Sequence, residues 1–186
     1  MRTLSKKTQY TLRALYSLAR NYGKGPTLIA KVAVEESIPQ EFLENILLLL
    51  KRHGLVESKK GKGGGYSLCR SPEQVTIGSV IRIIEGPLAP LPCASETAYR
   101  RCDECSDDRF CGTRMVMKQV RDATAAILDR TTLAQVCRRV DEARAEVHAE
   151  RLVVGVEVHR SERRVGDAID RELDAHRRTT LARLAT

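Results

Sequence analysis

The sequence predicts a mainly α-helical protein built around a winged helix-turn-helix domain. Three observations lead to this class. Residues 37–53 have the apolar spacing of an amphipathic helix, residues 55–58 and 66–69 suit two short strands, and the turn between them at 59–65 holds three lysines and four glycines. A helix followed by a basic hairpin is the arrangement that places a helix in the major groove of DNA and a wing on the neighbouring phosphates. An ordinary solvated hairpin is the alternative.

Charge is concentrated at one end of the 186-residue chain, which is long enough for one domain or one and a half. The formal net charge is +8, and residues 1–86 hold 14 Lys and Arg against 7 Asp and Glu. This distribution predicts a polyanionic partner for the N-terminal part. The first ten residues lack the apolar core of a signal peptide, and no apolar run has the length of a membrane span. We therefore expect a soluble cytoplasmic protein with no membrane partner.

The helices are predicted by apolar spacing and by the residues that interrupt it. Thr27 is the expected cap of the second helix. Ser37 with Gln40 three residues later fits a capping box for the third, so the corner of the helix-turn-helix falls at 37–38. The expected helices span 4–22, 27–36, 37–53 and 76–85.

The third helix has an apolar and a polar face. We expect the apolar face to be buried and the polar face to meet a partner. The apolar face consists of Phe42, Ile46, Leu49 and His53, widened by Leu43, Leu47 and Leu50. The polar face consists of Gln40, Glu41, Glu44, Asn45, Lys51 and Arg52.

A proline- and cysteine-rich segment, the cysteine loop (87–112), follows the fourth helix. It is too long for a connector and too apolar for a linker, so we expect contacts that tie it down. A strong helix is predicted over 113–130, and a shorter one over 131–140. The long helix has an apolar seam that suits a partner helix, with packing inside the chain as the alternative. The seam consists of Val116, Val120, Ala123 and Ile127.

Four cysteines of the loop fall within nineteen residues, and one Cys-x-x-Cys pair is among them. In a reducing compartment, thiols this close indicate an iron–sulfur cluster, zinc, a redox switch or no chemistry. The irregular spacing favours a cluster over zinc. We expect Cys69 and Cys137 to be packed thiols. The four loop cysteines are Cys93, Cys102, Cys105 and Cys111.

Catalytic motifs are absent from the sequence. It contains no nucleophile elbow, no Walker motif and no His-Glu-x-x-His, and its four histidines are scattered. We therefore expect a protein that is not an enzyme.

The sequence resembles the Rrf-two family of bacterial winged-helix transcription regulators, which includes IscR-, NsrR- and RirA-type proteins. The resemblance covers about residues 1–136 in order, and the Gly-Gly-Gly-Tyr wing is a specific feature. The segments that carry it are LSKKTQYTLRALYSLA at 4–19, IPQEFLENILLLLKRHGLVESKKGKGGGYSL at 38–68, VTIGSVIRIIEGP at 75–87 and the cysteine loop running into CGTR at 111–114.

The resemblance implies a homodimer joined near 113–130, bound to double-stranded DNA at two related half-sites. It also implies DNA contacts from the start of the first helix, the recognition helix and the wing. Carried onto this chain, these contacts fall on Ser5 and Lys6, on Gln40, Glu41 and Asn45, and on Lys59, Lys60, Lys62 and Gly63.

For a cofactor, the resemblance implies three cysteine ligands, which match Cys93, Cys105 and Cys111. The family's fourth ligand is a histidine after the third cysteine or an aspartate of the first helix. Here residues 112–114 contain no histidine, and Gln9 or a neighbour stands at the place of the aspartate. Cys102 is an additional cysteine that can supply the missing ligand. Some family members sense without a cluster.

Our interpretation is a dimeric DNA-binding repressor whose cysteine loop holds an iron–sulfur cluster. One alternative is a cluster-free regulator that uses a thiol switch or a partner protein, and another is a metal-binding protein that does not read DNA. The expected parts are a winged helix-turn-helix domain at 1–86, the sensing cysteine loop at 87–112, a dimerisation helix with a short following helix at 113–140, and a weakly packed or partly disordered extension at 141–186.

Overall fold

The computed structural model describes residues 4–103, 105 and 107–150. The chain divides into two units, Met1–Arg139 and Val140–Thr186. Of the expected C-terminal extension, residues 141–150 are helical and 151–186 lie outside the described residues. In chain order the elements are α1 (Lys6–Arg20), α2 (Ile29–Glu35), α3 (Gln40–Arg52), β1 (Val56–Lys59), β2 (Gly65–Leu68), α4 (Ile77–Glu85), the 3-10 turns η1 (Pro92–Ala94) and η2 (Asp108–Phe110), and α5 (Gly112–Arg130).

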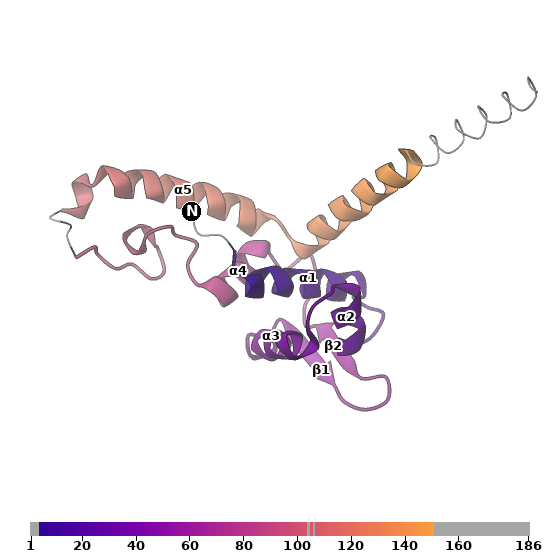
Figure 1. Cartoon of the computed structure of the whole chain (residues 1–186). Coiled ribbons are helices and arrows are strands. Elements are labelled where there is room, and N and C mark those ends of the chain that lie inside the picture. The colour runs from indigo at the N-terminus through magenta and orange to yellow at the C-terminus, as the bar shows by residue number, and fades with distance from the viewer. Residues whose placement is uncertain (1–3, 104, 106, 151–186) are drawn as a thin grey trace, which may run out of the picture. The chain divides into compact units, whose positions relative to one another are not determined.

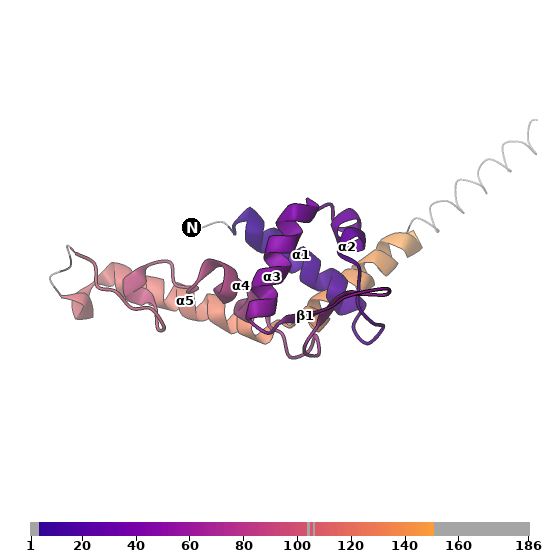
Figure 2. The same cartoon turned by 90° about the horizontal axis from the view of Figure 1, so that it is seen from below.

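The first unit is mainly helical and carries a two-stranded sheet, as the sequence predicts. Helices α1, α2 and α3 pack together beside the β1–β2 hairpin, and α5 runs alongside the cysteine loop in both views (Figures 1 and 2). The core contains side chains from the first four helices and from the hairpin. Its largest fully buried side chains include Leu15 of α1, Val32 of α2, Leu43, Ile46, Leu47 and Leu50 of α3, Val56 of β1 and Val80 of α4.

The buried face of α3 is rotated from the expected one. Leu43, Ile46, Leu47 and Leu50 are buried, as predicted, but His53 is exposed and Phe42 is 39% exposed. The Phe42 ring packs edge-on against Tyr10 of α1, with centroids 5.6 Å apart, so it covers the rim of the core.

The expected helix caps at Ser37 and Thr27 are both wrong. The N-cap of α3 is Pro39, without a side-chain hydrogen bond. Ser37 instead has a φ of 49°, and the next N–H, that of Ile38, donates to the carbonyl of Ala33. The corner is therefore made by the C-terminal turn of α2, in a backbone pattern that also satisfies a helix-end carbonyl.

Thr27 is engaged with the hairpin rather than with α2. Its N–H donates to the Tyr66 carbonyl at 2.8 Å and its carbonyl accepts from the Tyr66 N–H at 2.8 Å, which adds a bridge to β2. The N-cap of α2 is Leu28, which is exposed. The hairpin itself pairs β1 with β2 antiparallel, from Val56 opposite Leu68 to Lys59 opposite Gly65.

Helices α4 and α5 are joined at both backbone and side-chain level. Thr76 caps α4 through its side chain, and the chain after α5 returns to this point, with the Ile77 N–H donating to Thr131. Arg82 of α4 and Asp129 of α5 form a two-pronged ion pair at 2.5 and 2.9 Å. The expected short helix at 131–140 differs from the structure, in which residues 133–150 are helical.

Among the described residues, no helix has the length and apolarity needed to cross a bilayer. Cys137 is buried, as expected, whereas Cys69 is exposed and is not a packed thiol.

Candidate DNA interface and cysteine loop

The start of α3 presents the side chains expected to read DNA. Gln40, Glu41 and Asn45 are all exposed. Gln40 donates to the Glu44 carboxylate at 3.3 Å, and the Asn45 amide donates to the Glu41 carbonyl at 3.1 Å. These contacts are local and solvent-exposed, so the amides can exchange them for base edges.

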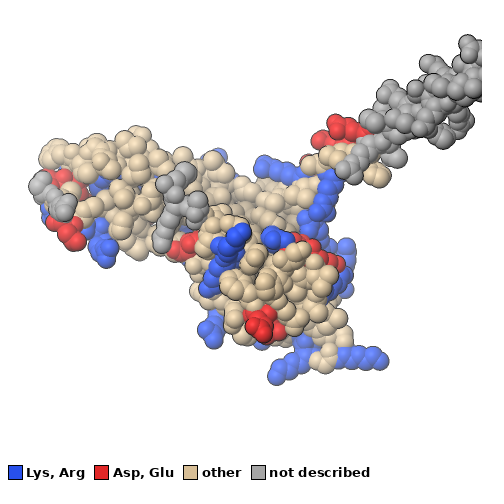
Figure 3. All heavy atoms as spheres, viewed as in Figure 1, with Lys and Arg blue, Asp and Glu red and all other residues tan. Residues whose placement is uncertain are grey.

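The wing tip carries unpaired cations. Lys59, Lys60, Lys62 and Gly63 are exposed, and within the described part of the chain none of the three lysines forms a salt bridge. Lys and Arg side chains project from the lower end of the molecule in Figure 3, where Figure 1 places the hairpin. The tip is therefore suited to phosphate contacts, which are electrostatic and independent of sequence.

Two glycines let the wing fold back on itself and on the domain. A Cβ at Gly64 would overlap the carbonyl oxygen of Lys59, and a Cβ at Gly65, where φ is 149°, would overlap the carbonyl of Thr27. The Gly-Gly-Gly-Tyr segment is thus required by close backbone approach as well as by turn geometry.

The recognition helix and the wing are joined directly. The Lys51 ammonium group near the end of α3 donates to the Ser58 hydroxyl of β1 at 2.6 Å. A duplex that contacts the polar edge of α3 is therefore close to the hairpin, which is the juxtaposition that a winged helix uses.

The start of α1 is fixed by α4. Ser5 caps α1, with its hydroxyl accepting from the Thr8 N–H, and its own N–H donates to the Glu85 carboxylate at 2.9 Å. The Thr8 hydroxyl, which is buried, donates to the same carboxylate at 2.5 Å. Ser5 and Lys6 are exposed, so α4 places the two expected DNA-contacting residues without covering them.

The cysteine loop brings thiols together. The Cys93 and Cys102 sulfur atoms are 3.6 Å apart, and Cys93 is only 4% exposed while Cys102 is exposed. The contact with Cys93 raises the pKa of Cys102, helped by desolvation and by nearby Cys111. Desolvation and the neighbouring Cys111 likewise raise the pKa of Cys105.

A ready-made metal site is not present among these side chains. In the described part of the chain, no three His, Cys, Asp or Glu residues are arranged to hold a metal ion. Gln9, at the place of the family aspartate, donates instead to the Leu4 carbonyl at 3.0 Å.

Two arginines of α5 hold the loop. Arg114 donates to the Cys93 carbonyl at 2.9 Å, and Arg121 donates to the Ala94 carbonyl at 2.6 Å. Arg121 is only 7% exposed, and its guanidinium group also pairs with Asp122 and with Glu96. The contacts expected to tie the loop down are therefore charge-assisted hydrogen bonds to the η1 backbone.

Comparison with known proteins gives the family. The Rrf2 family, described as iron-dependent transcriptional regulator, matches residues 4–139. The chain belongs to the Rrf2 family. A relative from Rhodobacter capsulatus, named rrf2-like, is 40% identical over 133 residues, which are 70% of this chain and 89% of the relative.

Two solved structures share the Rrf2 fold of this chain. CymR, the global cysteine regulator of B. subtilis, superposes with a TM-score of 0.63 at 30% identity, over 75% of this chain and 98% of CymR. IscR of T. potens superposes with a TM-score of 0.61 at 29% identity, over 76% of this chain and 90% of IscR. The predicted winged helix-turn-helix class is confirmed. This Rrf2 chain is a transcriptional regulator and not an enzyme.

Sequence reasoning missed the two arginines that hold the loop. They are seven residues apart, so they lie two turns apart on one face of α5. The available signal was a pair of arginines on the inner face of a helix, next to a loop that was expected to be held by contacts. The DNA-contacting residues and the metal ligands taken from the family stay predictions.

Proposed function

We propose that this Rrf2 chain acts as a homodimer on an operator with two related half-sites, that it represses transcription, and that an iron–sulfur cluster on the cysteine loop sets its DNA affinity. One observation carries the proposal: two arginines of α5 donate hydrogen bonds to the backbone carbonyls of Cys93 and Ala94. Chemistry at the thiols then acts on the helix that we assign to the dimer contact.

The outer face of α5 supports the dimer assignment. Val116 is 52% exposed and Ile127 is 66% exposed, although both are large apolar residues on one helix, and Ala123 between them is exposed too. Val120, the fourth member of the seam, is half-buried. An apolar stripe on a helix surface is the feature that a partner helix covers.

The DNA roles are divided by chemistry. We assign base contacts to the α3 residues, because amide and carboxylate groups read base edges, and phosphate contacts to the wing and to the start of α1. The base-reading residues are Gln40, Glu41 and Asn45. The phosphate-binding residues are Ser5, Lys6, Lys59, Lys60, Lys62 and Gly63.

The donor set of the loop fits an iron–sulfur cluster in kind. Thiolates are the ligands that such clusters use, and all four thiols belong to one loop. Two of them are already in contact, although the loop has to close further before three thiolates can bind one metal ion or cluster. When bound, a cluster supplies reversible one-electron chemistry and sensitivity to oxidants. The residues that would hold it are Cys93, Cys102, Cys105 and Cys111.

A thiol switch is the second candidate, and the 3.6 Å contact of Cys93 with Cys102 favours it. A disulfide requires about 2.05 Å, so the sulfurs have to move by roughly 1.5 Å. Oxidation by hydrogen peroxide removes two electrons and two protons from the pair and yields the disulfide and two waters. The disulfide would connect η1 covalently to the part of the loop that contains Cys102.

Preparation without oxygen separates the candidates. The full chain is purified anaerobically, and its iron, acid-labile sulfide and absorption spectrum are measured alongside binding to an operator selected from random DNA. Bound iron and sulfide whose removal changes operator affinity supports the cluster. Metal-free protein with full affinity that changes only on oxidation refutes the cluster and supports the switch.

Two further readouts test the remaining parts of the proposal. Sedimentation of the protein bound to a duplex with both half-sites is expected to give two chains per duplex, whereas one chain would refute the dimer. A reporter transcribed from a promoter that contains the operator is expected to fall when the protein is present, and an increase would refute repression.

A further inference from the structure

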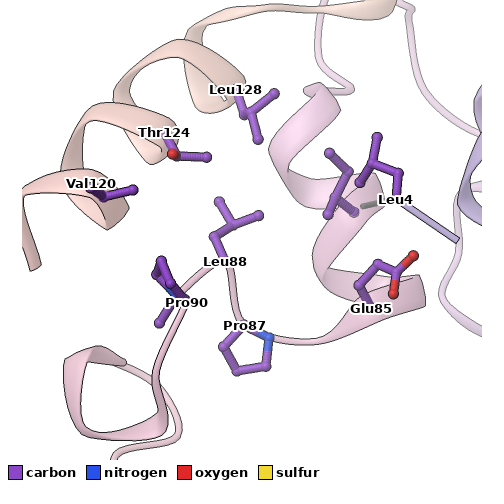
Figure 4. Close-up of a pocket in the computed structure, with 10 residues that line it drawn as sticks. Leu4, Glu85, Pro87, Leu88, Pro90, Val120, Thr124 and Leu128 are labelled. Atoms are coloured by element: carbon purple, nitrogen blue, oxygen red, sulfur yellow. The ribbon is translucent and has the colours of Figure 1, made fainter. Parts of the chain in front are cut away.

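A cavity of ≈ 160 Å³, partly open to solvent, lies between α4, α5 and the first residues of the cysteine loop. Figure 4 shows Val120, Thr124 and Leu128 from successive turns of α5 facing Leu88 of the loop. Ile81 of α4 also lines the cavity, so its walls are mostly aliphatic. The DNA-binding roles and the thiol chemistry assigned above do not use this space, although Val120 in its wall also belongs to the apolar seam assigned to the dimer contact.

The size and lining of the cavity define the class of molecule that fits. A protein cavity of about 150 Å³ lined by aliphatic and aromatic side chains is large enough for benzene. The polar groups at the edge are the Thr124 hydroxyl and the Glu85 carboxylate, and Glu85 already accepts hydrogen bonds from Ser5 and Thr8. An uncharged, apolar molecule with one ring or a short branched chain matches these walls.

Residues from three parts of the chain line the cavity, and these are the parts that regulation has to connect. Leu4, in its wall, directly precedes the N-cap residue Ser5, and Glu85, which also lines the cavity, accepts a hydrogen bond from the Ser5 N–H. Leu88 belongs to the segment that leads to Cys93, and Leu128 belongs to α5. Filling the space therefore changes the packing behind the start of α1, beneath the loop and against the assigned dimer helix.

We propose that this cavity is a binding site for one small apolar molecule, and that its occupation shifts the affinity of the chain for DNA. The second part rests on the proposed function. A ligand shifts an equilibrium only by its different affinity for two states, so the occupant has to prefer one arrangement of α1, the loop and α5.

Methyl NMR of the full chain tests the site without reference to DNA. Toluene is the probe, and the methyl groups of Leu88, Val120 and Leu128 are expected to shift in a saturable way. Methyl groups of the winged-helix core, such as those of Leu47 and Val56, are expected to stay unchanged. Absence of saturable shifts at the cavity methyls overturns the proposal, including the case in which a second copy of the chain fills the space.

A filling variant and a matched control locate the binding. Ala89 lines the cavity, and Ala98 is an exposed residue of the same loop outside it. Ala89→Phe is expected to abolish the toluene shifts, and Ala98→Phe is expected to keep them. Retention of the shifts in a folded Ala89→Phe protein places toluene elsewhere and overturns the assignment.

The second part of the proposal, the effect on DNA binding, is tested by measuring operator affinity with and without toluene. We expect at least a twofold change in the wild type and in Ala98→Phe, and none in Ala89→Phe. Saturable methyl shifts without any change in affinity overturn the coupling and leave the site standing. Methyl shifts in a protein that binds no selected DNA sequence count against the proposed function instead.

Discussion

Gly65 is a residue at which the wing backbone lies close to the start of α2. Its position opposite the Thr27 carbonyl leaves no room for a Cβ, and its φ of 149° disfavours other residues. The next residue, Tyr66, makes both hydrogen bonds to Thr27 that join the hairpin to the start of α2. The orientation of the wing therefore depends on a position without a side chain.

Replacing this residue gives the first prediction. Gly65→Ala is expected to lower the free energy of unfolding by roughly 1–3 kcal/mol, because the new Cβ has to displace Thr27 or the hairpin. Urea denaturation measures the change. Gly112→Ala is the control, because nothing lies within 4 Å of a Cβ there, and it is expected to be neutral or stabilising by up to about 1 kcal/mol. Equal stability of the two variants would contradict the packing described here.

The Arg82–Asp129 pair gives a pH-dependent prediction. The hydrogen bonds from Arg82 lower the pKa of Asp129 below its ordinary value. The pair thus stabilises the fold above the unfolded pKa, about 3.9, and this contribution is lost as the pH falls toward the folded pKa. Both side chains are about two-fifths exposed, so we expect only about 0.2–1 kcal/mol.

Asp129→Asn is the variant that isolates this contribution. The difference in unfolding free energy between wild type and variant is expected to be present at pH 6 and to shrink between about pH 4 and pH 3. Chemical denaturation at several pH values measures it. A difference that stays constant over this range would show that the ion pair contributes nothing.

At the residue scale, the sequence predicted the exposure of polar residues better than it predicted burial or hydrogen-bond partners. Phe42, His53 and Cys69 were expected to be buried and are exposed. The expected DNA-contacting residues are all exposed, because polar groups on an amphipathic helix or a glycine-rich tip have no apolar surface to cover. The partners of Thr27 and Ser37 were wrong, because each is set by the position of another element. Tyr66 pairs with Thr27 from 39 positions further along the chain, which no local pattern reports.

At the scale of single elements, variants of the wing and of α3 distinguish phosphate contacts from base contacts. Lys59→Ala with Lys60→Ala is expected to weaken binding to all duplexes and to reduce the slope of log affinity against log salt by about 0.9 per lost phosphate contact. Fluorescence anisotropy over a salt series measures the slope. Gln40→Ala or Asn45→Ala is expected to relax sequence preference instead.

Lys118→Ala is the matched control for the wing variant. It removes one positive charge from α5, outside the expected DNA contacts, so the salt slope is expected to stay unchanged. If the wing variant keeps the wild-type slope, Lys59 and Lys60 do not bind phosphates.

The anchoring of η1 by α5 gives a prediction about thiol exposure. Arg121→Gln removes a donor from the Ala94 carbonyl, and leaving a buried acceptor unsatisfied costs about 1–3 kcal/mol. Opening of the loop is then expected to rise by about fivefold or more. The rate of Cys93 alkylation by iodoacetamide, followed by mass spectrometry on reduced, metal-free protein, measures this opening.

Arg109→Gln controls for the loss of an arginine from the same region. Arg109 is exposed and pairs with Asp107, two residues away, so the bond is local and the alkylation rate is expected to match the wild type. Equal rates in Arg121→Gln and the wild type would show that the buried arginine does not hold the loop.

Elements were predictable where a local signal defines them. The helices and the hairpin follow from apolar spacing and from breakers such as Gly86, where φ is 85°. The ends of α3 and the rotation of its buried face were less predictable, because α1 decides which residues it covers. The fold of the cysteine loop had no periodic signal at all, since its shape comes from α5 arginines and from thiol contacts.

At the scale of the whole molecule, the first unit links two chemistries through shared helices. Glu85 at the end of α4 holds the start of α1, Arg82 on the same helix pairs with α5, and α5 holds the backbone of Cys93. A change at the thiols thus has a continuous set of contacts through which to reach the DNA-facing side. Both proposed forms of sensing, by cluster or by disulfide, require Cys93.

The most direct test is the operator affinity of Cys93→Ser, prepared without oxygen and compared with the wild type and with Cys69→Ser. Cys69 is exposed and lies outside the loop, so its variant is expected to bind within about twofold of the wild type. Cys93→Ser is expected to differ from the wild type by about tenfold or more. The difference is expected before peroxide treatment if the variant removes a cluster ligand, and only after peroxide treatment if it removes a disulfide partner. An unchanged affinity, before and after treatment with peroxide, would contradict control of DNA binding by the cysteine loop.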